Sequence, residues 1–349
     1  MPADSLRPNA ASSPADSLPP DAPSLPDGLP ADSAPSLPDG LPADSAPSLP
    51  DGLRLGPVEL TVADLTRAVA WYEEALGLVV HEREDGRARL GDGRTVVLVL
   101  HEDPAATPPG RGHAGLFHYA LLFPSREELA RAALRLSATS IRSQGASDHE
   151  THEAIYLADA DGNGIELAAD RPRAAWPEHL GYANGPQPLD VGSLMATIEG
   201  EAPQATVGEG LRVGHLHLHV GDIEEGLAFY RDTIGFALRA SLGSAAFVSA
   251  GGYHHHLGFN VWNGHGVGAP PPHTVGLRAW TVLLDAPAIA ALRDRLERAG
   301  HHVDDAPEGG EAAAPGRGVA AAQAAGVEGA PRGFLVRDPW GTPLHVASG

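Results

Sequence analysis

Histidine, tyrosine and glutamate side chains that could do chemistry are concentrated in residues 115–170. His118 lies within the apolar run LFHYALLF, and Glu166 follows the turn sequence Asp-Gly-Asn-Gly. Tyr156 lies ten residues before Glu166, and His149 lies seven residues before Tyr156. Imidazole and carboxylate groups bind transition metals, and imidazole and phenol groups also transfer protons. We therefore take these four side chains as the candidate reactive set.

The elements that must position this set form one β-α-β-β-β unit. The apolar run LFHYALLF predicts a buried strand, and the Pro-Ser dipeptide after it opens a helix with Ser125 as its cap. Leucine and alanine residues at near-helical spacing occupy residues 128–137. The runs EAIYLAD and IELAA predict two further strands around the turn at 161–164. The sequence therefore places the candidate set on one small module.

The same module recurs along the chain, and this internal repeat is the main evidence for the fold. VELTV predicts a strand, Asp64 caps the helix that follows it, and Gly77 ends that helix. Residues 212–238 repeat these features, with Val-Gly-Asp in place of Val-Ala-Asp and Phe-Tyr in place of Trp-Tyr. A fourth copy covers 277–346, where DPWG parallels DADG. The prediction is an α+β chain of four repeated β-α-β-β-β modules.

The run from His149 through AIYLADADGNGIE resembles the signature of the extradiol ring-cleavage dioxygenases, within the vicinal oxygen chelate superfamily. Ala160 stands where that signature has Pro, and Ser147 lies outside its usual set. The stretches that resemble two-domain catechol-2,3-dioxygenase-like members are GLFHYALLFPSR, EAIYLADADGNGIEL, VGHLHLHV and SAGGYHHHLGFNVW. The resemblance covers roughly residues 55–349. It implies a vicinal oxygen chelate fold, in which paired modules curl their sheets into half-barrels around a metal.

In this family the metal ligands come from the first and last strands of the modules. Six positions of the chain correspond to these places: Pro57, His118, Glu166, His215, Arg278 and His345. Pairing the first module with the second, or the third with the fourth, leaves Pro or Arg at a ligand position. Pairing the second with the third gives His118, Glu166 and His215, a two-His-one-carboxylate set that suits Fe(II) or Mn(II). The resemblance therefore implies an Fe(II) site built from these three side chains, with Mn(II) as the alternative.

Other imidazoles are expected to line the same cavity. The three histidines of HLHLH alternate and point to one face of a strand, so His217 is expected to contact the substrate. In YHHHLG, His254 and His256 share one face, and either is a candidate acid–base group. Trp262 is a candidate wall for an aromatic ring. The alternative is a polar barrel wall without catalysis. Eight further histidines are predicted to lie on the surface: His81, His101, His113, His152, His265, His273, His301 and His302.

The resemblance implies extradiol cleavage of a catechol-type aromatic diol by O2, with the metal binding both hydroxyl oxygens. His149 and Tyr156 would hydrogen-bond the substrate oxygen, and a cavity histidine would transfer a proton. Two other functions remain open on this scaffold. One is a non-redox metal-dependent lyase or isomerase, which oxygen consumption would exclude. The other is a metal-free small-molecule binding or resistance protein, which metal content would exclude.

Composition narrows the classes of partner. Among 349 residues, 24 basic and 45 acidic side chains give a formal charge of -21, which disfavours nucleic-acid binding through phosphate neutralisation. The absence of Cys excludes disulfides, thiolate zinc sites and cysteine nucleophiles, and it fits a cytoplasmic protein. We expect no membrane span, because no apolar run approaches ~18 residues, and no signal peptide.

The predicted organisation has a tail, two domains and a linker. Residues 1–53 contain two copies of DGLPADSAPSLP in a Pro/Ser/Asp-rich tail that cannot bury enough apolar surface to fold, so we predict disorder. Residues 54–171 and 212–349 are predicted to form two half-barrel domains of two modules each, joined by a linker at 172–211. An Ala/Gly-rich insert at 306–333 is predicted to be a disordered loop. The resembled family often dimerises, so a homodimer is the expected assembly.

Overall fold

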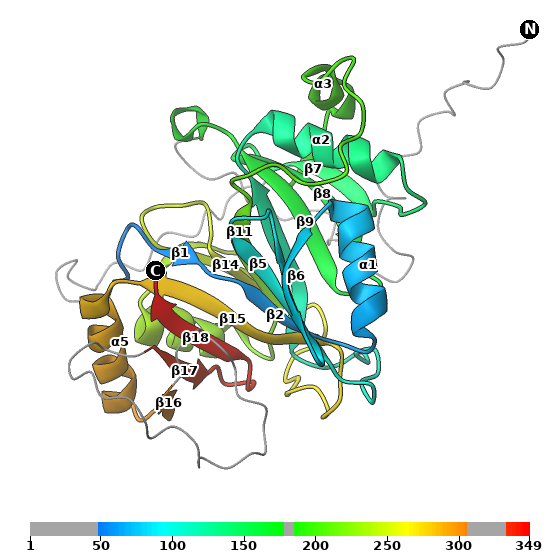
Figure 1. Ribbon diagram of the computed structural model, residues 1–349. Helices are drawn as coiled ribbons and strands as arrows, with labels where there is room; N and C mark the ends of the chain where they lie inside the picture. Colours follow the sequence, from blue (N-terminus) through cyan, green and yellow to red (C-terminus); the bar gives the residue numbers. More distant parts are fainter. Residues whose placement is uncertain (1–47, 178–184, 306–332) are drawn as a thin grey trace, which may run out of the picture.

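The computed structural model describes residues 48–177, 185–305 and 333–349 (Figure 1). Most of the predicted tail and almost all of the predicted 306–333 loop lie outside these residues. The described strands form two large sheets, and helices pack against them, α1 against β4 and β5 and α5 against β16 and β18 (Figure 1). The α+β prediction is confirmed. Among the described helices, none combines the length and the apolar character that crossing a bilayer requires.

Each predicted module is present as a strand, a helical segment and three further strands. The first contains β2 (Val58–Val62), α1 (Leu65–Leu76), β3 (Val79–Glu84), β4 (Arg87–Gly91) and β5 (Val96–Glu102). The second contains β6 (Gly115–Phe123), α2 (Arg126–Ser137), β7 (Gly145–Asp148), β8 (His152–Ala158) and β9 (Gly164–Asp170). The third contains β11 (Arg212–His219), α4 (Ile223–Leu227) with its π-helical extension Ala228–Ile234, β12 (Ala237–Ser241), β13 (Ala245–Ser249) and β14 (Leu257–Asn260).

The fourth module contains β15 (Gly276–Leu284), α5 (Ala286–Arg298), β16 (Val303–Asp305), β17 (Phe334–Arg337) and β18 (Pro343–Ser348). Short elements outside the modules are β1 (Arg54–Leu55), a 3-10 turn at Arg173–Ala175, β10 (Gln187–Pro188) and α3 (Val191–Ala196).

The helix boundaries follow local chemistry. The Asp64 carboxylate accepts a hydrogen bond from the Arg67 N–H at 2.9 Å and caps α1, which ends at Gly77 with a φ of 66° that glycine tolerates best.

The two sheets do not follow the order of the modules along the chain. The first and fourth modules form one sheet in the order β16-β17-β18-β15-β2-β5-β4-β3, with β1 paired to β15. We call this the β2–β15 sheet. The second and third modules form the other, in the order β10-β7-β8-β9-β6-β11-β14-β13-β12, which we call the β6–β11 sheet. Each sheet therefore contains strands from both predicted domains, and the pairing that the predicted metal set requires is present.

Contacts on the helical side join modules that are neighbours in sequence. The Tyr72 hydroxyl donates to Asp159 at 2.7 Å and links the first module to the second. The Tyr230 hydroxyl donates to Asp338 at 2.8 Å and links the third to the fourth in the same way. All four side chains are buried, and a hydrogen bond to a charged group typically contributes about 1.5–3 kcal/mol. The sheets and these links together connect all four modules.

Candidate metal centre

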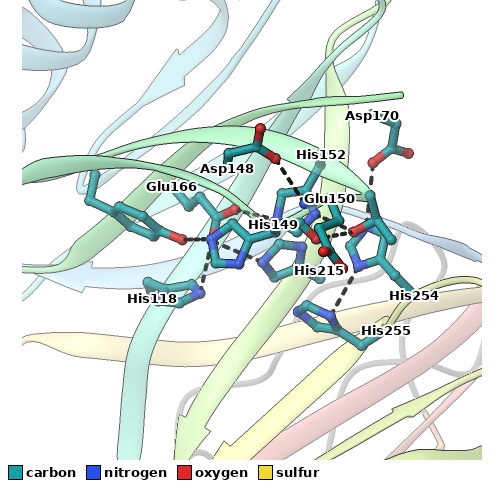
Figure 2. Close-up of polar contacts among 12 residues, drawn as sticks. His118, Asp148, His149, Glu150, His152, Glu166, Asp170, His215, His254 and His255 are labelled. Atoms are coloured by element: carbon teal, nitrogen blue, oxygen red, sulfur yellow. Dashed lines mark hydrogen bonds and ion pairs between the residues drawn. The ribbon is translucent and has the colours of Figure 1, made fainter. Parts of the chain in front are cut away.

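The three side chains predicted as metal ligands converge on central strands of the β6–β11 sheet. His118 lies on β6, between Glu166 on β9 and His215 on β11. The Nε2 atoms of His118 and His215 lie 3.2 Å and 3.1 Å from the same Glu166 oxygen, Oε2. One ligand atom from each residue lies within 4.8 Å of the others. Figure 2 shows the two imidazoles beside the Glu166 carboxylate. The pairing of the second and third modules thus brings the predicted set together.

Burial determines the electrostatics of this set. Glu166 and His215 are 1% and 2% exposed, and His118 is also buried. Burial acts to raise the pKa of Glu166, but nearby His215 and the hydrogen bonds from His118, His152 and His215 hold that pKa well below its ordinary value. Burial lowers the pKa of His215, which favours the neutral imidazole. An ionised carboxylate among neutral imidazoles is the protonation state in which such side chains bind metal.

A β-bulge lies beside His118. In the ladder between β6 and β11, His118 pairs with His217 and Leu116 pairs with Leu218, so Phe117 has no partner of its own. Bulges redirect side chains and are frequent next to active sites. The ring of His217 lies 5.2 Å from the rings of both Phe117 and His118. The bulge therefore places an aromatic side chain beside the predicted ligand.

His149 and Tyr156, which the sequence selected as candidate site residues, form a hydrogen-bonded pair next to Glu166. His149 Nε2 lies 2.7 Å from Tyr156 Oη, and Tyr156 is opposite Glu166 in the ladder between β8 and β9. Burial, followed by the charge of Glu166, raises the pKa of Tyr156 well above its ordinary value. Burial, followed by the influence of His152, lowers the pKa of His149 to about 4. Both side chains are therefore neutral near pH 7.

The prediction that His152 lies on the surface is wrong. Its side chain is 3% exposed, and its Nε2 lies 3.1 Å from Glu166 Oε1. Its ring stacks between those of His149 and His254, with centroids 4.5 Å from each. His152 begins β8, and the alternation of strand side chains places it on the face of Tyr156, which was the signal that could have identified it. Of the other seven histidines predicted to be exposed, three are partly buried: His101, His113 and His301.

The predicted alternation in YHHHLG is also wrong, because these histidines precede β14 and do not lie in a regular strand. His254 and His255 both lie beside His215, with ring centroids 5.7 Å and 4.2 Å from that of His215. His256 is directed elsewhere. Its Nδ1 accepts a hydrogen bond from the backbone N–H of Ala250 at 3.2 Å, whereas the Nδ1 of His254 lies 3.0 Å from that of His255. His254 and His256 therefore do not share a face.

The two residues predicted to contact substrate lie at one side of the ligand set. His217 is buried, and its Nε2 accepts a hydrogen bond from the Asn260 amide at 2.9 Å. Trp262 is 40% exposed, and its ring lies 5.4 Å from the rings of both His217 and Phe117. Trp262 is therefore an exposed side chain next to the buried His217.

The prediction that Arg278 occupies the position of His118 in the fourth module is wrong. In the ladder between β2 and β15, Ala279 pairs with Glu59 as His118 pairs with His217 in the other sheet. Arg278 is the unpaired residue of a bulge. β6 carries the same bulge at Phe117, so the bulge is not the source of the error. Arg278 lies six residues before the end of β15 at Leu284, whereas His118 lies five residues before the end of β6 at Phe123. Ala279 therefore holds the position that corresponds to His118.

Two curled sheets built from four modules, with a His/Glu cluster on one sheet, define a protein of the vicinal oxygen chelate class. The sequence matches the Glyoxalase/Bleomycin resistance protein/Dioxygenase superfamily over residues 54–167 and 212–346, and the chain belongs to this superfamily. The resemblance seen in the sequence is confirmed.

One relative in sequence and one solved structure of similar fold illustrate the comparison. A Bacillus subtilis (strain 168) protein named catechol-2,3-dioxygenase is 38% identical over 258 residues, which cover 72% of this chain and 90% of that protein. The crystal structure of a putative dioxygenase from Bacillus subtilis subsp. subtilis str. 168 has a TM-score of 0.56 with 12% identity. That alignment covers 84% of this chain and 85% of the other, and it shows similarity of fold.

Proposed function

We propose that this chain is a metal-dependent extradiol ring-cleavage dioxygenase that acts on a catechol-type aromatic diol with O2. The observation that carries the proposal is the convergence of His118 Nε2 and His215 Nε2 on Glu166 Oε2 at 3.2 Å and 3.1 Å. The 38% identity to a protein named catechol-2,3-dioxygenase supports a reaction of this class.

The donor set fits a divalent iron ion, with manganese as the alternative. Two imidazoles and one carboxylate suit these ions and leave coordination positions open. His118, Glu166 and His215 would hold the ion. A bound ion would supply Lewis acidity toward the two hydroxyl groups of a catechol and the redox chemistry that a reaction with O2 requires.

We assign His149 and Tyr156 to the binding of a substrate oxygen. Their 2.7 Å hydrogen bond fixes the position of the phenol group, which lies opposite Glu166 in the ladder. Because both groups are neutral near pH 7, the pair can donate one hydrogen bond and accept another without first losing or gaining a proton. That property suits a diol whose hydroxyl groups ionise during binding.

We assign His254 to proton transfer. Burial lowers its pKa well below the ordinary value, so the imidazole is neutral and can accept a proton. Its ring lies 5.7 Å from that of His215, within the same buried cluster. His256 has no such role in this proposal, because its Nδ1 is occupied by the backbone N–H of Ala250.

Aromatic side chains beside the ligand set suit an aromatic substrate. The rings of Phe117, Phe247 and Trp262 lie 5.2–5.6 Å from that of His217. Edge-to-face and offset ring contacts at such distances favour flat aromatic groups. We therefore assign His217 and Trp262 to substrate binding.

The test is metal analysis of anaerobically purified protein, followed by oxygen uptake with catechol, for wild type, His215→Ala and His345→Ala. The control His345→Ala removes an equally buried histidine from the other sheet. We expect bound iron and oxygen uptake in wild type and in the control, and neither in His215→Ala.

Each other outcome has a defined meaning. Iron and uptake that survive His215→Ala would contradict the ligand assignment. Bound metal without uptake would favour non-redox lyase or isomerase chemistry. Absence of metal in all three proteins would favour a binding protein.

A further inference from the structure

A second group of potential ligands lies beside the first. His152, Asp170 and His254 each offer one ligand atom, and these atoms lie within 4.8 Å of one another. We propose that this group is a second binding site for a divalent transition metal. The proposal goes beyond the function argued above, in which the metal lies at the Glu166 site and His254 transfers a proton; a metal at the second site would occupy the Nε2 lone pair of His254 and replace that role. Like that site, the group consists of two imidazoles and one carboxylate, a set that suits divalent iron, manganese or cobalt.

The backbone holds the three side chains together. His152 and Asp170 are direct partners at the end of the ladder between β8 and β9. His254 comes from the segment before β14, and its ring stacks on that of His152 with centroids 4.5 Å apart and planes inclined by 16°. His254 Nε2 lies 3.3 Å from Asp170 Oδ1 (Figure 2). Both imidazoles are buried, so few water molecules can compete for the ligand positions.

Hydrogen bonds prepare His152 to bind a cation. The Thr151 hydroxyl lies 3.4 Å from the carbonyl oxygen of His149, to which it donates, and 2.9 Å from His152 Nδ1. A hydroxyl that donates to the carbonyl can accept the Nδ1–H of His152, which leaves the lone pair on Nε2. Metal-binding histidines are commonly oriented in this way through the other ring nitrogen. Without a cation, His152 Nε2 carries the hydrogen and donates to Glu166 Oε1 at 3.1 Å; binding of a cation would move that hydrogen to Nδ1, where the Thr151 hydroxyl can accept it.

His254 and Asp170 are oriented in a similar way. His254 Nδ1 lies 3.0 Å from His255 Nδ1, so one of the two nitrogens carries the hydrogen. When His254 donates, its Nε2 lone pair is directed toward Asp170. The Tyr253 hydroxyl donates to Asp170 Oδ2 at 3.0 Å and fixes the carboxylate.

The charge balance also favours a cation. Glu166 and Asp170 supply two carboxylates to the cluster. Arg212 is 3.9 Å from Asp170 Oδ2, and its side chain is 56% exposed. A half-exposed guanidinium at this distance is partly screened by solvent and neutralises the partly buried Asp170 carboxylate weakly. The contact between His152 and Glu166 lies between the Glu166 site and the second site, so each site would hold its own divalent ion.

The experiment is binding of cobalt(II) to the full-length protein. After unbound metal is removed, cobalt per chain is measured by elemental analysis and its coordination by visible absorption. We expect two equivalents in wild type, and one in each of Asp170→Asn, His152→Asn and His118→Ala. The matched control is Asp148→Asn, which alters a half-buried aspartate that pairs with Arg171 instead of a histidine and should keep two equivalents.

The outcomes separate this proposal from the proposed function. One equivalent in wild type that is kept in Asp170→Asn and His152→Asn but lost in His118→Ala would overturn the second site alone. One equivalent that is lost in Asp170→Asn and kept in His118→Ala would support the second site and overturn the first. Absence of bound cobalt in wild type would overturn both. His152→Asn keeps the test valid if Asp170→Asn does not fold.

Discussion

The β6–β11 sheet and the β2–β15 sheet follow the same strand plan but carry different chemistry. The β2–β15 sheet has other residues at the corresponding positions. Ala279 takes the place of His118, His345 that of Glu166 and Leu335 that of Tyr156. Pro57, directly before β2, takes the place of His215. Proline and alanine offer no ligand atom, so the β2–β15 sheet keeps a single histidine where the other sheet has three ligands. The module therefore supplies positions, and the side chains at those positions decide whether a metal site exists.

The β2–β15 sheet contains a different polar cluster. Glu59 is buried, with His101 Nε2 2.8 Å from one carboxylate oxygen and His345 Nδ1 3.5 Å from the other. These two contacts give each carboxylate oxygen of Glu59 a partner within the protein. By contrast, three imidazole nitrogens converge on Glu166. Both sheets thus bury a carboxylate among imidazoles, but among the described residues the groups with enough close ligand atoms to suit a metal all lie in the second and third modules, which form the β6–β11 sheet.

The largest expected contrast comes from substituting the central carboxylate of each sheet. Glu166→Gln removes the only charged ligand of the proposed site, so metal affinity should fall by more than the about 100-fold typical of a residue that merely orients a ligand. Oxygen uptake with catechol should be lost. Glu59→Gln should keep iron and uptake. Metal content is measured by elemental analysis and oxygen uptake by an oxygen electrode. Equal losses in both variants would contradict the proposed difference between the two sheets.

A gain-of-function variant would test whether the missing ligands alone explain why the β2–β15 sheet lacks a metal site like that of the β6–β11 sheet. The double variant Pro57→His/Ala279→His would add two imidazoles near His345 in the β2–β15 sheet. We expect one more equivalent of bound cobalt than in wild type, and no gain in either single variant. Correct folding without the extra equivalent would show that the backbone of this sheet, and not only its side chains, differs from that of the other.

Tyr156→Phe should separate catalysis from metal binding. Phenylalanine keeps the ring opposite Glu166 but cannot hydrogen-bond His149 or a substrate oxygen. We expect kcat for catechol to fall by about 100-fold, the lower end of the range for a group that assists proton transfer. Iron content should be unchanged. Loss of iron together with activity would instead make Tyr156 part of the support for the ligands.

The last expected effect is on stability and concerns the Tyr–Asp links between modules that are neighbours in sequence. Burial raises the pKa of Asp338 to about 6, against the opposing effect of hydrogen bonds from Tyr230 and Thr342. Because the unfolded carboxyl has a lower pKa, the folded state binds more protons between about pH 4 and pH 6, so this group contributes most to stability below that window. Its contribution should fall by up to about 3 kcal/mol as the pH rises through the window.

Urea unfolding of wild type and Asp338→Asn from pH 4 to pH 7 measures this effect. The free energy of unfolding of wild type relative to the variant should decrease over that range. The matched variant Asp159→Asn removes the corresponding carboxylate from the link between the first and second modules. A constant difference between wild type and Asp338→Asn would contradict the pKa shift of Asp338.

The sequence alone determined the module and much of the site. Strand, helix and turn signals depend on residues a few positions apart, so the caps at Asp64 and Ser125 and the four repeats could be read directly. The spacing of His149, Tyr156 and Glu166 predicted a set that the structure brings together. These residues belong to one module, and the geometry of a single hairpin fixes their arrangement.

Only the tertiary structure decided what depends on contacts between distant segments. The pairing of β15 with β2, which are more than 200 residues apart in sequence, fixes the register that places Ala279, and not Arg278, at the position of His118. His152 is buried because His254, from another module, stacks on its ring. The directions of His254 and His256 are set in an irregular segment, where the two-residue repeat of a strand does not apply. Local sequence fixes local geometry, whereas the packing of one module on another decides which side chains meet.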